Sequence, residues 1–156
     1  MNVEYINAFI EASQIVLRQM AGINAKLGNT YLKASPYQSD AVLIIVGLTG
    51  NVRGQVVFTM NKRAAMCIAS GMMAGVTISE LDEISKSAVT ELTNTILGNT
   101  ATILYNKGIK VEITPPSLLM GDNMEVTTNK MKTLCVPLTI SNDNDIMEID
   151  LSVIDN

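Results

Sequence analysis

The sequence predicts an α+β fold, in which helices, one of them long and central, cover a mainly antiparallel sheet. Residues 79–105 have the spacing of one long amphipathic helix, and two pairs of Val/Ile-rich segments, at 41–60 and 131–154, are typical of strands. An internal echo supports two duplicated helix-plus-strands units, because Glu11-Ala12-Ser13-Gln14 recurs about 80 residues later as Glu91-Leu92-Thr93-Asn94. Helices and strands do not alternate strictly, which favours α+β over a doubly wound sheet.

Length and composition favour one domain over residues 1–156. Hydrophobic residues make up 47% of the chain and charged residues 17%, which excludes a disordered protein. The net charge of −4, without a Lys/Arg cluster, argues against nucleic acid and anionic membranes as partners. Charges interrupt the N-terminal segment and the longest apolar run, near 41–48, is too short to cross a bilayer. We therefore expect a cytoplasmic protein.

The first part of the chain is expected to form a helix and then a hairpin. Residues 3–21 are amphipathic, and Gly22 is a natural helix end. The polar stretch 28–39 contains Pro36, which limits it to a loop or a short edge strand. Gly50-Asn51, between two Val/Ile-rich segments, predicts a hairpin with a two-residue turn.

Two further helices are predicted from their caps. Asn61 is expected to cap a helix that runs to about residues 71–75. Ser79 and Asp82 match a variant of the capping box and are expected to open the central helix. Asn106-Lys107-Gly108 is expected to end it.

The last third of the chain is predicted to be mostly strand. Residues 109–114 form one strand, which Pro115-Pro116 closes. Residues 131–140 and 146–154 form a second pair of strands. Pro137 inside the first of these predicts an edge position or a bulge.

Two sides of the central helix differ in character. Each residue advances by about 100° on an ideal helix, which gives an apolar stripe of Leu81, Ile84, Ala88, Leu92, Ile96 and Ile103. Glu91 and Asn94 share a second side with Ser87 and Gly98. Gly98 leaves room there for another surface to come close. A carboxylate and a carboxamide on adjacent turns can be offered together to a partner.

Several absences narrow the chemistry. The chain has no histidine, the usual general base and the commonest metal ligand. Cys67 and Cys135 lie in apolar surroundings without CxxC spacing and are expected to be buried, reduced thiols. No Gly-rich phosphate loop or dinucleotide fingerprint is present. An enzyme with this sequence is expected to work without a strong base or a cofactor of its own.

An ordered set of motifs resembles the CheX family of chemotaxis phosphatases, to which CheC and FliY are related. The main matches are Thr90-Glu91-Leu92-Thr93-Asn94, Gly98 and Val111-Glu112-Ile113-Thr114-Pro115-Pro116. Further matches over nearly the whole chain are Asn7-Ala8-Phe9-Ile10, Ile45-Val46-Gly47-Leu48-Thr49-Gly50 and Met72-Met73-Ala74-Gly75. The motif occurs as a single full copy, which resembles CheX, whereas CheC typically carries two.

The resemblance implies a phosphatase that acts on the aspartyl phosphate of a CheY-like response regulator, beside a Mg²⁺ ion that the regulator binds. The family's carboxamide maps onto Asn94, which would orient the attacking water, and its carboxylate maps onto Glu91, which would pair with a partner lysine. Thr93 and Thr95 stand where the family often has a small residue and Met. No cofactor of its own is implied, and family members form homodimers, which is therefore expected here.

Three alternatives stay open at this point. Taken alone, Glu91 and Asn94 read as ordinary exposed polar residues of a helix. Glu11 and Gln14 are expected to be such residues, although the amide of Gln14 leaves a degenerate second site open. A non-catalytic module that binds a response regulator, or a scaffold related to the flagellar switch proteins, is the alternative function; the water-positioning amide argues against it.

Overall fold

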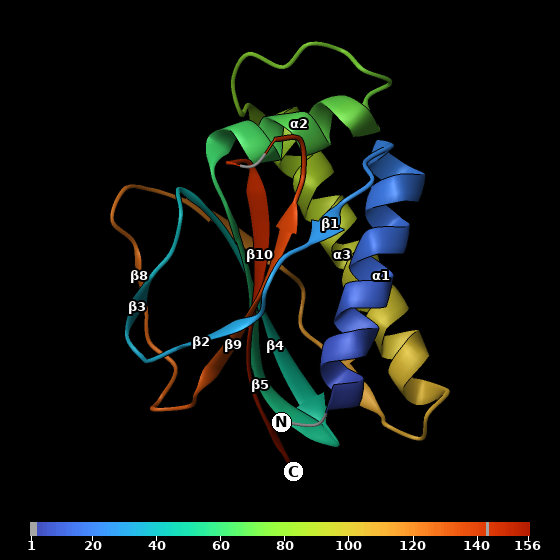
Figure 1. Ribbon diagram of the computed structural model, residues 1–156, viewed down its shortest axis with the longest axis vertical. Coiled ribbons are helices and arrows are strands. Elements are labelled where there is room, and N and C mark those ends of the chain that lie inside the picture. Colours follow the sequence, from blue (N-terminus) through green and yellow to red (C-terminus); the bar gives the residue numbers. More distant parts are fainter. Residues whose placement is uncertain (1–2, 143) are drawn as a thin grey trace.

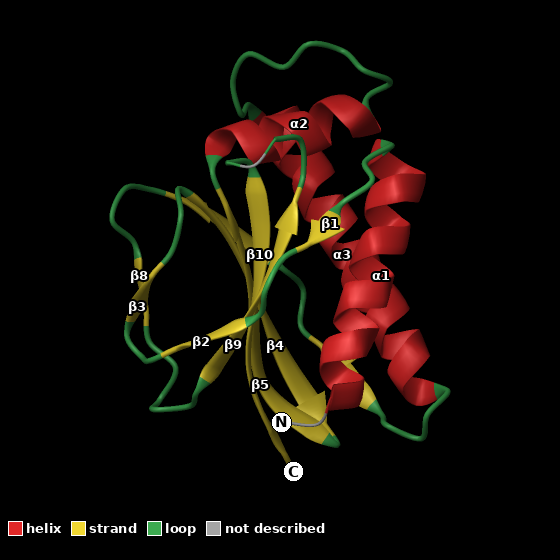
Figure 2. Cartoon of the chain, viewed as in Figure 1, coloured by secondary structure: helices red, strands yellow, loops and turns green. Residues whose placement is uncertain are grey.

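The computed structural model describes residues 3–142 and 144–156. Three helices are present among them: α1 (Val3–Ala21), α2 (Lys62–Met72) and α3 (Glu83–Tyr105). The strands are β1 (Lys26–Leu27), β2 (Tyr31–Lys33), β3 (Tyr37–Gln38), β4 (Val42–Gly50), β5 (Val52–Met60), β6 (Val111–Ile113), β7 (Ser117–Met120), β8 (Glu125–Val126), β9 (Thr133–Thr139) and β10 (Ile146–Asp155). Helices α1 and α3 lie side by side on one side of the sheet, and the β3–β8 ribbon lies on the other (Figures 1 and 2). The predicted α+β fold is confirmed.

The sheet shows the predicted duplication directly. Its order is β1-β9-β10-β5-β4-β6, with β2 also on β9 and β7 also on β4, and every pair is antiparallel. The central pair is β5 with β10, where Val57 lies opposite Asp150. Each half supplies two long strands, and two of its short strands pair with the outer long strand of the other half. The two units therefore exchange strands across an approximate two-fold axis.

The helices repeat at the predicted spacing. Six buried positions of α1 have a buried counterpart 80 residues later in α3. The pairs are Tyr5 and Ser85, Phe9 and Val89, Ala12 and Leu92, Ser13 and Thr93, Val16 and Ile96, and Leu17 and Leu97. Glu11 and Glu91 are thus counterparts, as are Gln14 and Asn94.

Helix α3 begins later than predicted. Its N-cap is Asp82, whose carboxylate accepts a hydrogen bond from the Ser85 N–H at 2.8 Å, and Ser79 lies outside the helix. The predicted apolar stripe is correct at Leu92 and Ile96, which are fully buried, but wrong at Ile84, which is 66% exposed. The buried face instead includes Thr93 and Thr100, whose hydroxyls donate hydrogen bonds to backbone carbonyls of the preceding turn.

The cap of α2 and the hairpin strands are confirmed, but the tight hairpin turn is wrong. The Asn61 side chain accepts from the Ala64 N–H at 2.7 Å. The last residues that β4 and β5 pair with each other are Leu48 and Gly54. Beyond them the tip of β4 pairs with β6 and the start of β5 pairs with β10. Pairing with neighbouring strands thus replaces a two-residue turn.

Short strands were the elements least visible in the sequence. Strand β7 follows Pro116 directly and was not predicted, whereas β2 is the short strand allowed within residues 28–39. The register on β9 shifts by one residue between β1 and β2, opposite Pro137, whose carbonyl accepts from the Gly28 N–H at 2.9 Å. The extra residue lies in the segment between β1 and β2 and not in β9, which keeps an unbroken register with β10, so the predicted irregularity occurs opposite Pro137 rather than in its own strand. The same shift recurs between β6 and β7 on β4, beside the bond of Thr114 N–H to the Gly47 carbonyl.

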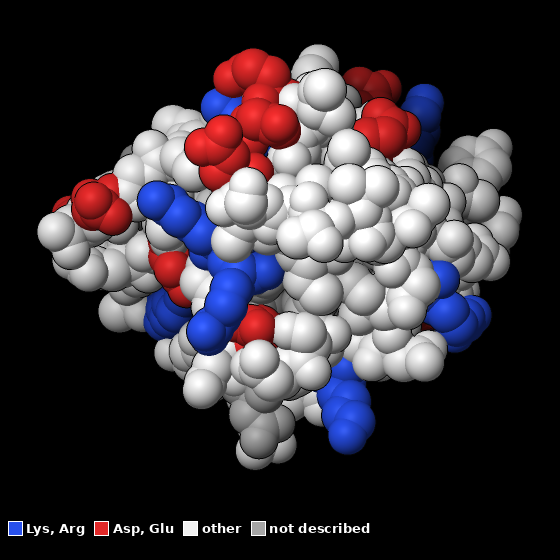
Figure 3. All heavy atoms as spheres, turned by 90° about the horizontal axis from the view of Figure 1, so that it is seen from above, with Lys and Arg blue, Asp and Glu red and all other residues white. Residues whose placement is uncertain are grey.

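One face of the surface carries charges of both signs (Figure 3). On the face at the α2 end, a broad uncharged area has a group of basic side chains on one side and acidic side chains mainly toward the top of the view (Figure 3). None of the described helices combines the length and the apolar character that crossing a membrane requires.

Candidate functional site

Glu91 and Asn94 both lie on the exposed side of α3, together with Ser87 and Gly98, as predicted. Within the described part of the chain, the side chains of Glu91 and Asn94 have no hydrogen-bond or ion-pair partner. A carboxamide offers one acceptor oxygen and two donor N–H groups, and a carboxylate offers two acceptor oxygens. Both groups are therefore free for a molecule that approaches this side of the helix.

The helix that carries them is firmly anchored. Between the two residues, Leu92 and Thr93 point into the core and are fully buried. The Thr93 hydroxyl donates to the Val89 carbonyl at 3.0 Å, so its burial leaves no unpaired hydroxyl. Because the backbone is held from within, Glu91 and Asn94 keep a fixed separation of about one helical turn.

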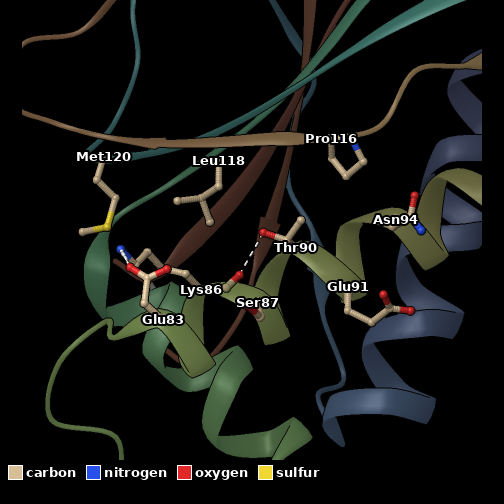
Figure 4. Close-up of a pocket in the computed structure, with 9 residues that line it drawn as sticks. All are labelled: Glu83, Lys86, Ser87, Thr90, Glu91, Asn94, Pro116, Leu118 and Met120. Carbon is tan, nitrogen blue, oxygen red and sulfur yellow. Dashed lines mark hydrogen bonds and ion pairs between the residues drawn. The ribbon is translucent and has the colours of Figure 1, made fainter.

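A groove of about 550 Å³ opens beside this pair, between α3 and β7. Its helix wall consists of Glu83, Lys86, Ser87, Thr90, Glu91 and Asn94, and its strand wall of Pro116, Leu118 and Met120 (Figure 4). Thr90 donates its hydroxyl to the Lys86 carbonyl at 2.8 Å, so this hydroxyl already has an acceptor on its own helix. The sequence analysis missed the strand wall, although the alternation of Leu118 and Met120 after Pro116 is a strand signal.

Gly98 extends the open surface along the helix. A side chain built at Gly98 would meet no atom within 4 Å. Its backbone angles are helical, so no turn geometry requires glycine there, and glycine costs helix stability relative to alanine. Its consequence is the open space one turn beyond Asn94, as expected from the sequence.

The counterpart positions on α1 do not form an equivalent site. The Gln14 amide donates to the Ala25 carbonyl at 3.4 Å. Glu11 is exposed and makes no such hydrogen bond within the described residues. Arg18 stands at the position of Gly98, so a long cationic side chain replaces the open space. A hollow of about 500 Å³ beside α1 is lined by Ile6, Leu32 and other mainly apolar residues, but by neither Glu11 nor Gln14. The structure thus favours ordinary surface roles for Glu11 and Gln14.

A second polar cluster lies on the other face of the sheet, beneath β3. The Lys33 ammonium donates to Glu148 at 2.6 Å and lies 3.4 Å from Asp150, and the Tyr31 hydroxyl donates to Glu148. Cys135 lies beside the two carboxylates. The sequence analysis missed this cluster, but two carboxylates at alternate positions of a strand otherwise rich in apolar residues could have revealed it.

Charge balance explains how this cluster is tolerated. Burial and the neighbouring Glu148 raise the pKa of Asp150 to about 7. Burial lowers the pKa of Lys33, but its hydrogen bond to Glu148 and the charge of Asp150 outweigh burial and raise that pKa overall. Lys33 thus supplies the positive charge between the two carboxylates and ties β2 to β10. We assign the cluster a structural role.

Both cysteines carry free thiols. Cys135 is buried, and burial raises its pKa above the ordinary value, so the protonated thiol is favoured. Cys67 is half-buried. Neither lines the groove beside Glu91 and Asn94.

Comparisons with known proteins agree with this fold and identify the family. The family model for the chemotaxis phosphatase CheX matches residues 42–139. The chain is 28% identical, over 153 residues, to the CheY-P phosphatase CheX of Thermotoga maritima, which covers 98% of this chain and 97% of that protein.

Solved structures of this family are similar over nearly the full length. CheX from Desulfovibrio desulfuricans superposes with a TM-score of 0.83 and 26% identity, over 98% of this chain and 99% of that one. The CheX–CheY–BeF3–Mg²⁺ complex from Borrelia burgdorferi contains a chain with a TM-score of 0.78 and 31% identity, over 96% of this chain and 97% of that one. Because the family model matches more than half of the sequence, the chain belongs to the CheX family of chemotaxis phosphatases.

Proposed function

We propose that this protein, as a single domain over residues 1–156, hydrolyses the aspartyl phosphate of a CheY-like response regulator. Family membership makes it a phosphatase, which is a hydrolase. One observation carries the choice of site: a free carboxylate and a free carboxamide lie one turn apart on the exposed side of an anchored helix, at the edge of a groove.

The proposed reaction is an in-line displacement at phosphorus. Water forms the new P–O bond, the bond to the aspartate oxygen breaks, and the products are aspartate and inorganic phosphate, which keeps the water's oxygen. The transition state is loose, so the protein contributes mainly by positioning and charge stabilisation. The Asn94 carbonyl oxygen accepts a hydrogen bond from the water and directs its lone pair at phosphorus. No proton has to be taken up by the amide.

Glu91 supports docking in this proposal. Its carboxylate is unpaired in the described structure and pairs with a lysine of the regulator, which brings Asn94 over the phosphoryl group. The divalent cation belongs to the regulator, in keeping with the Mg²⁺ named in the CheX–CheY complex of Borrelia burgdorferi. The protein itself needs no cofactor for these steps.

The proposed working unit is a cytoplasmic homodimer. Dimerisation is a property that the family resemblance implies. Size-exclusion chromatography with light scattering tests this part separately. A mass equal to one chain at micromolar concentration contradicts the dimer and leaves the hydrolysis proposal standing.

The decay of a phosphorylated CheY-type receiver in Mg²⁺ tests the activity, measured with the parent protein and with Asn94→Ala. We expect the parent protein to accelerate phosphate release and the variant to lose this acceleration while still binding the receiver. A parent protein that binds the receiver activated by beryllofluoride, yet leaves the decay rate unchanged, supports instead the non-catalytic binding or scaffold module.

A further inference from the structure

The groove beside Glu91 and Asn94 reaches well beyond the atoms that hydrolysis requires. Lys86 precedes Asn94 by eight residues on the same helix, which is about 12 Å along the axis. Figure 4 shows Lys86 with Met120 at one end of the groove and Glu91 with Asn94 at the other. A phosphoryl group held at Asn94 cannot touch Lys86, so the far end of the groove can contact only other parts of a docked protein.

Lys86 is available to such a protein. Its ammonium contacts the Glu83 carboxylate at 2.8 Å, but the Glu83 side chain is 92% exposed. The Lys86 side chain is 29% exposed, so water reaches the pair mainly from the Glu83 side, and an ion pair that is open to water in this way is weak. A carboxylate of a docked protein can therefore replace Glu83 without the loss of a buried interaction.

The strand wall of this end is apolar. Leu118 is half-buried and Met120 is 37% exposed, and both line the groove from β7. The combination of one lysine with an apolar wall fits a surface that presents a carboxylate next to an apolar side chain.

The other half of the fold shows that the lysine is not required for folding. When the strand registers of the two halves are matched, Leu118 on β7 corresponds to Leu32 on β2. Leu32 also lines a hollow, which lies beside α1. The helical counterpart of Lys86 is Ile6, which lines that same hollow. The apolar strand residue is thus common to both halves, whereas the helix position beside it carries a cation only in the half that carries Asn94; the cation of the other hollow, Lys132, lies outside the helix, just before β9.

We infer that the Lys86 end of the groove selects the receiver: it binds the receiver's surface through a carboxylate at Lys86 and an apolar side chain on Leu118 and Met120. This inference rests on the proposed function, because it assigns the groove to the same docked partner. The Lys86 end of the groove then contributes affinity and selectivity, Glu91 contributes to docking at the other end, and Asn94 determines turnover.

Steady-state hydrolysis of a phosphorylated CheY-type receiver in Mg²⁺ tests this division. We expect Lys86→Glu and Met120→Asp each to raise KM about tenfold or more with kcat within about twofold, because they weaken docking and leave the reacting groups in place. Lys86→Arg keeps the charge and is expected to keep KM within about threefold. Lys107→Glu, the same charge change at an exposed position outside the groove, is the matched control and is expected to leave both constants unchanged.

The outcomes separate this inference from the proposed function. An unchanged KM in both Lys86→Glu and Met120→Asp, with hydrolysis that still depends on Asn94, overturns the groove assignment alone. Should the parent protein fail to hydrolyse the receiver, the dissociation constant of the receiver activated by beryllofluoride decides. A weakened complex in both groove variants but not in Lys107→Glu supports the groove, and equal affinities overturn it. Circular dichroism and thermal melts confirm that each variant is folded.

Discussion

Helices α3 and α1 are counterparts in a duplicated fold, yet only α3 carries a complete candidate site. Their buried residues match closely, and each has a glutamate at the same position. They differ on the exposed side, where Asn94 corresponds to Gln14 and Gly98 to Arg18. Packing thus preserved the buried face in both halves, whereas the exposed face, which packing does not constrain, diverged. The candidate site therefore depends on the exposed residues that differ between the helices, Asn94 and Gly98, rather than on the glutamate that both helices share.

The largest effect is expected from removal of the amide in each half. Asn94→Ala should lower the turnover of phosphorylated receiver by about 10²-fold or more, because the attacking water loses its orientation. Gln14→Ala should leave turnover unchanged, since the Gln14 amide bonds to its own chain at Ala25. Single-turnover phosphate release measures both. A comparable loss in Gln14→Ala would show that α1 also acts on the substrate.

Exchange of the residues at the Gly98 and Arg18 positions should produce the next largest effect. Gly98→Arg should raise KM about tenfold or more, because a long side chain would occupy the open space beside the docked partner. Stability should not fall, since glycine is a poor helix residue. The reciprocal control Arg18→Gly should leave KM unchanged. Normal kinetics for Gly98→Arg would place the partner elsewhere.

A third test concerns the centre of the sheet, where the two halves meet as Val57 opposite Asp150. The pKa of Asp150 in the folded protein is raised from 3.8 to about 7. Between about pH 4 and 7 the folded protein therefore binds a proton that the unfolded chain has lost, so a rise in pH lowers the free energy of unfolding.

Asp150→Asn should remove that pH dependence. Urea denaturation measures the free energy of unfolding at pH 5 and at pH 8. From pH 5 to pH 8 this free energy should fall more for the parent protein than for the variant, by on the order of 2 kcal/mol. The lowered pKa of Glu148 acts in the opposite direction, but at lower pH than this window. If the free energy of unfolding falls equally in the two proteins, the pKa of Asp150 is not raised in the folded protein.

The smallest expected effect concerns the residue at which α3 begins. Asp82→Ala should lower the free energy of unfolding by about 1 kcal/mol, because the Ser85 N–H loses its acceptor. Ser79→Ala should change it by less than about 0.5 kcal/mol, since Ser79 lies outside the helix. Thermal or urea denaturation measures both changes. The opposite order would support the capping box that the sequence pattern indicated.

Much of the fold could be predicted from the sequence because local patterns report local structure. The helix at 3–21, the Asn61 cap and the long strands follow from hydrophobic spacing and turn residues, which act over a few residues. The pairing of Glu91 with Asn94 on one exposed side follows from helix geometry alone. The repeat of four residues was sufficient to predict the duplication, since both helices have to bury the same face.

Only the tertiary structure decided that the groove beside α3 is lined by Glu91 and Asn94, whereas the hollow beside α1 is lined by neither Glu11 nor Gln14. The strand wall of Leu118 and Met120 is separated from Glu91 by about 27 residues or more, and no local pattern states that β7 pairs with β4 beside α3. The exchange of short strands between the halves, the burial of Asp150 next to Lys33 and the true start of α3 are likewise products of long-range packing. Sequence periodicity determined which residues share a face; the contacts between distant segments determined what each face meets.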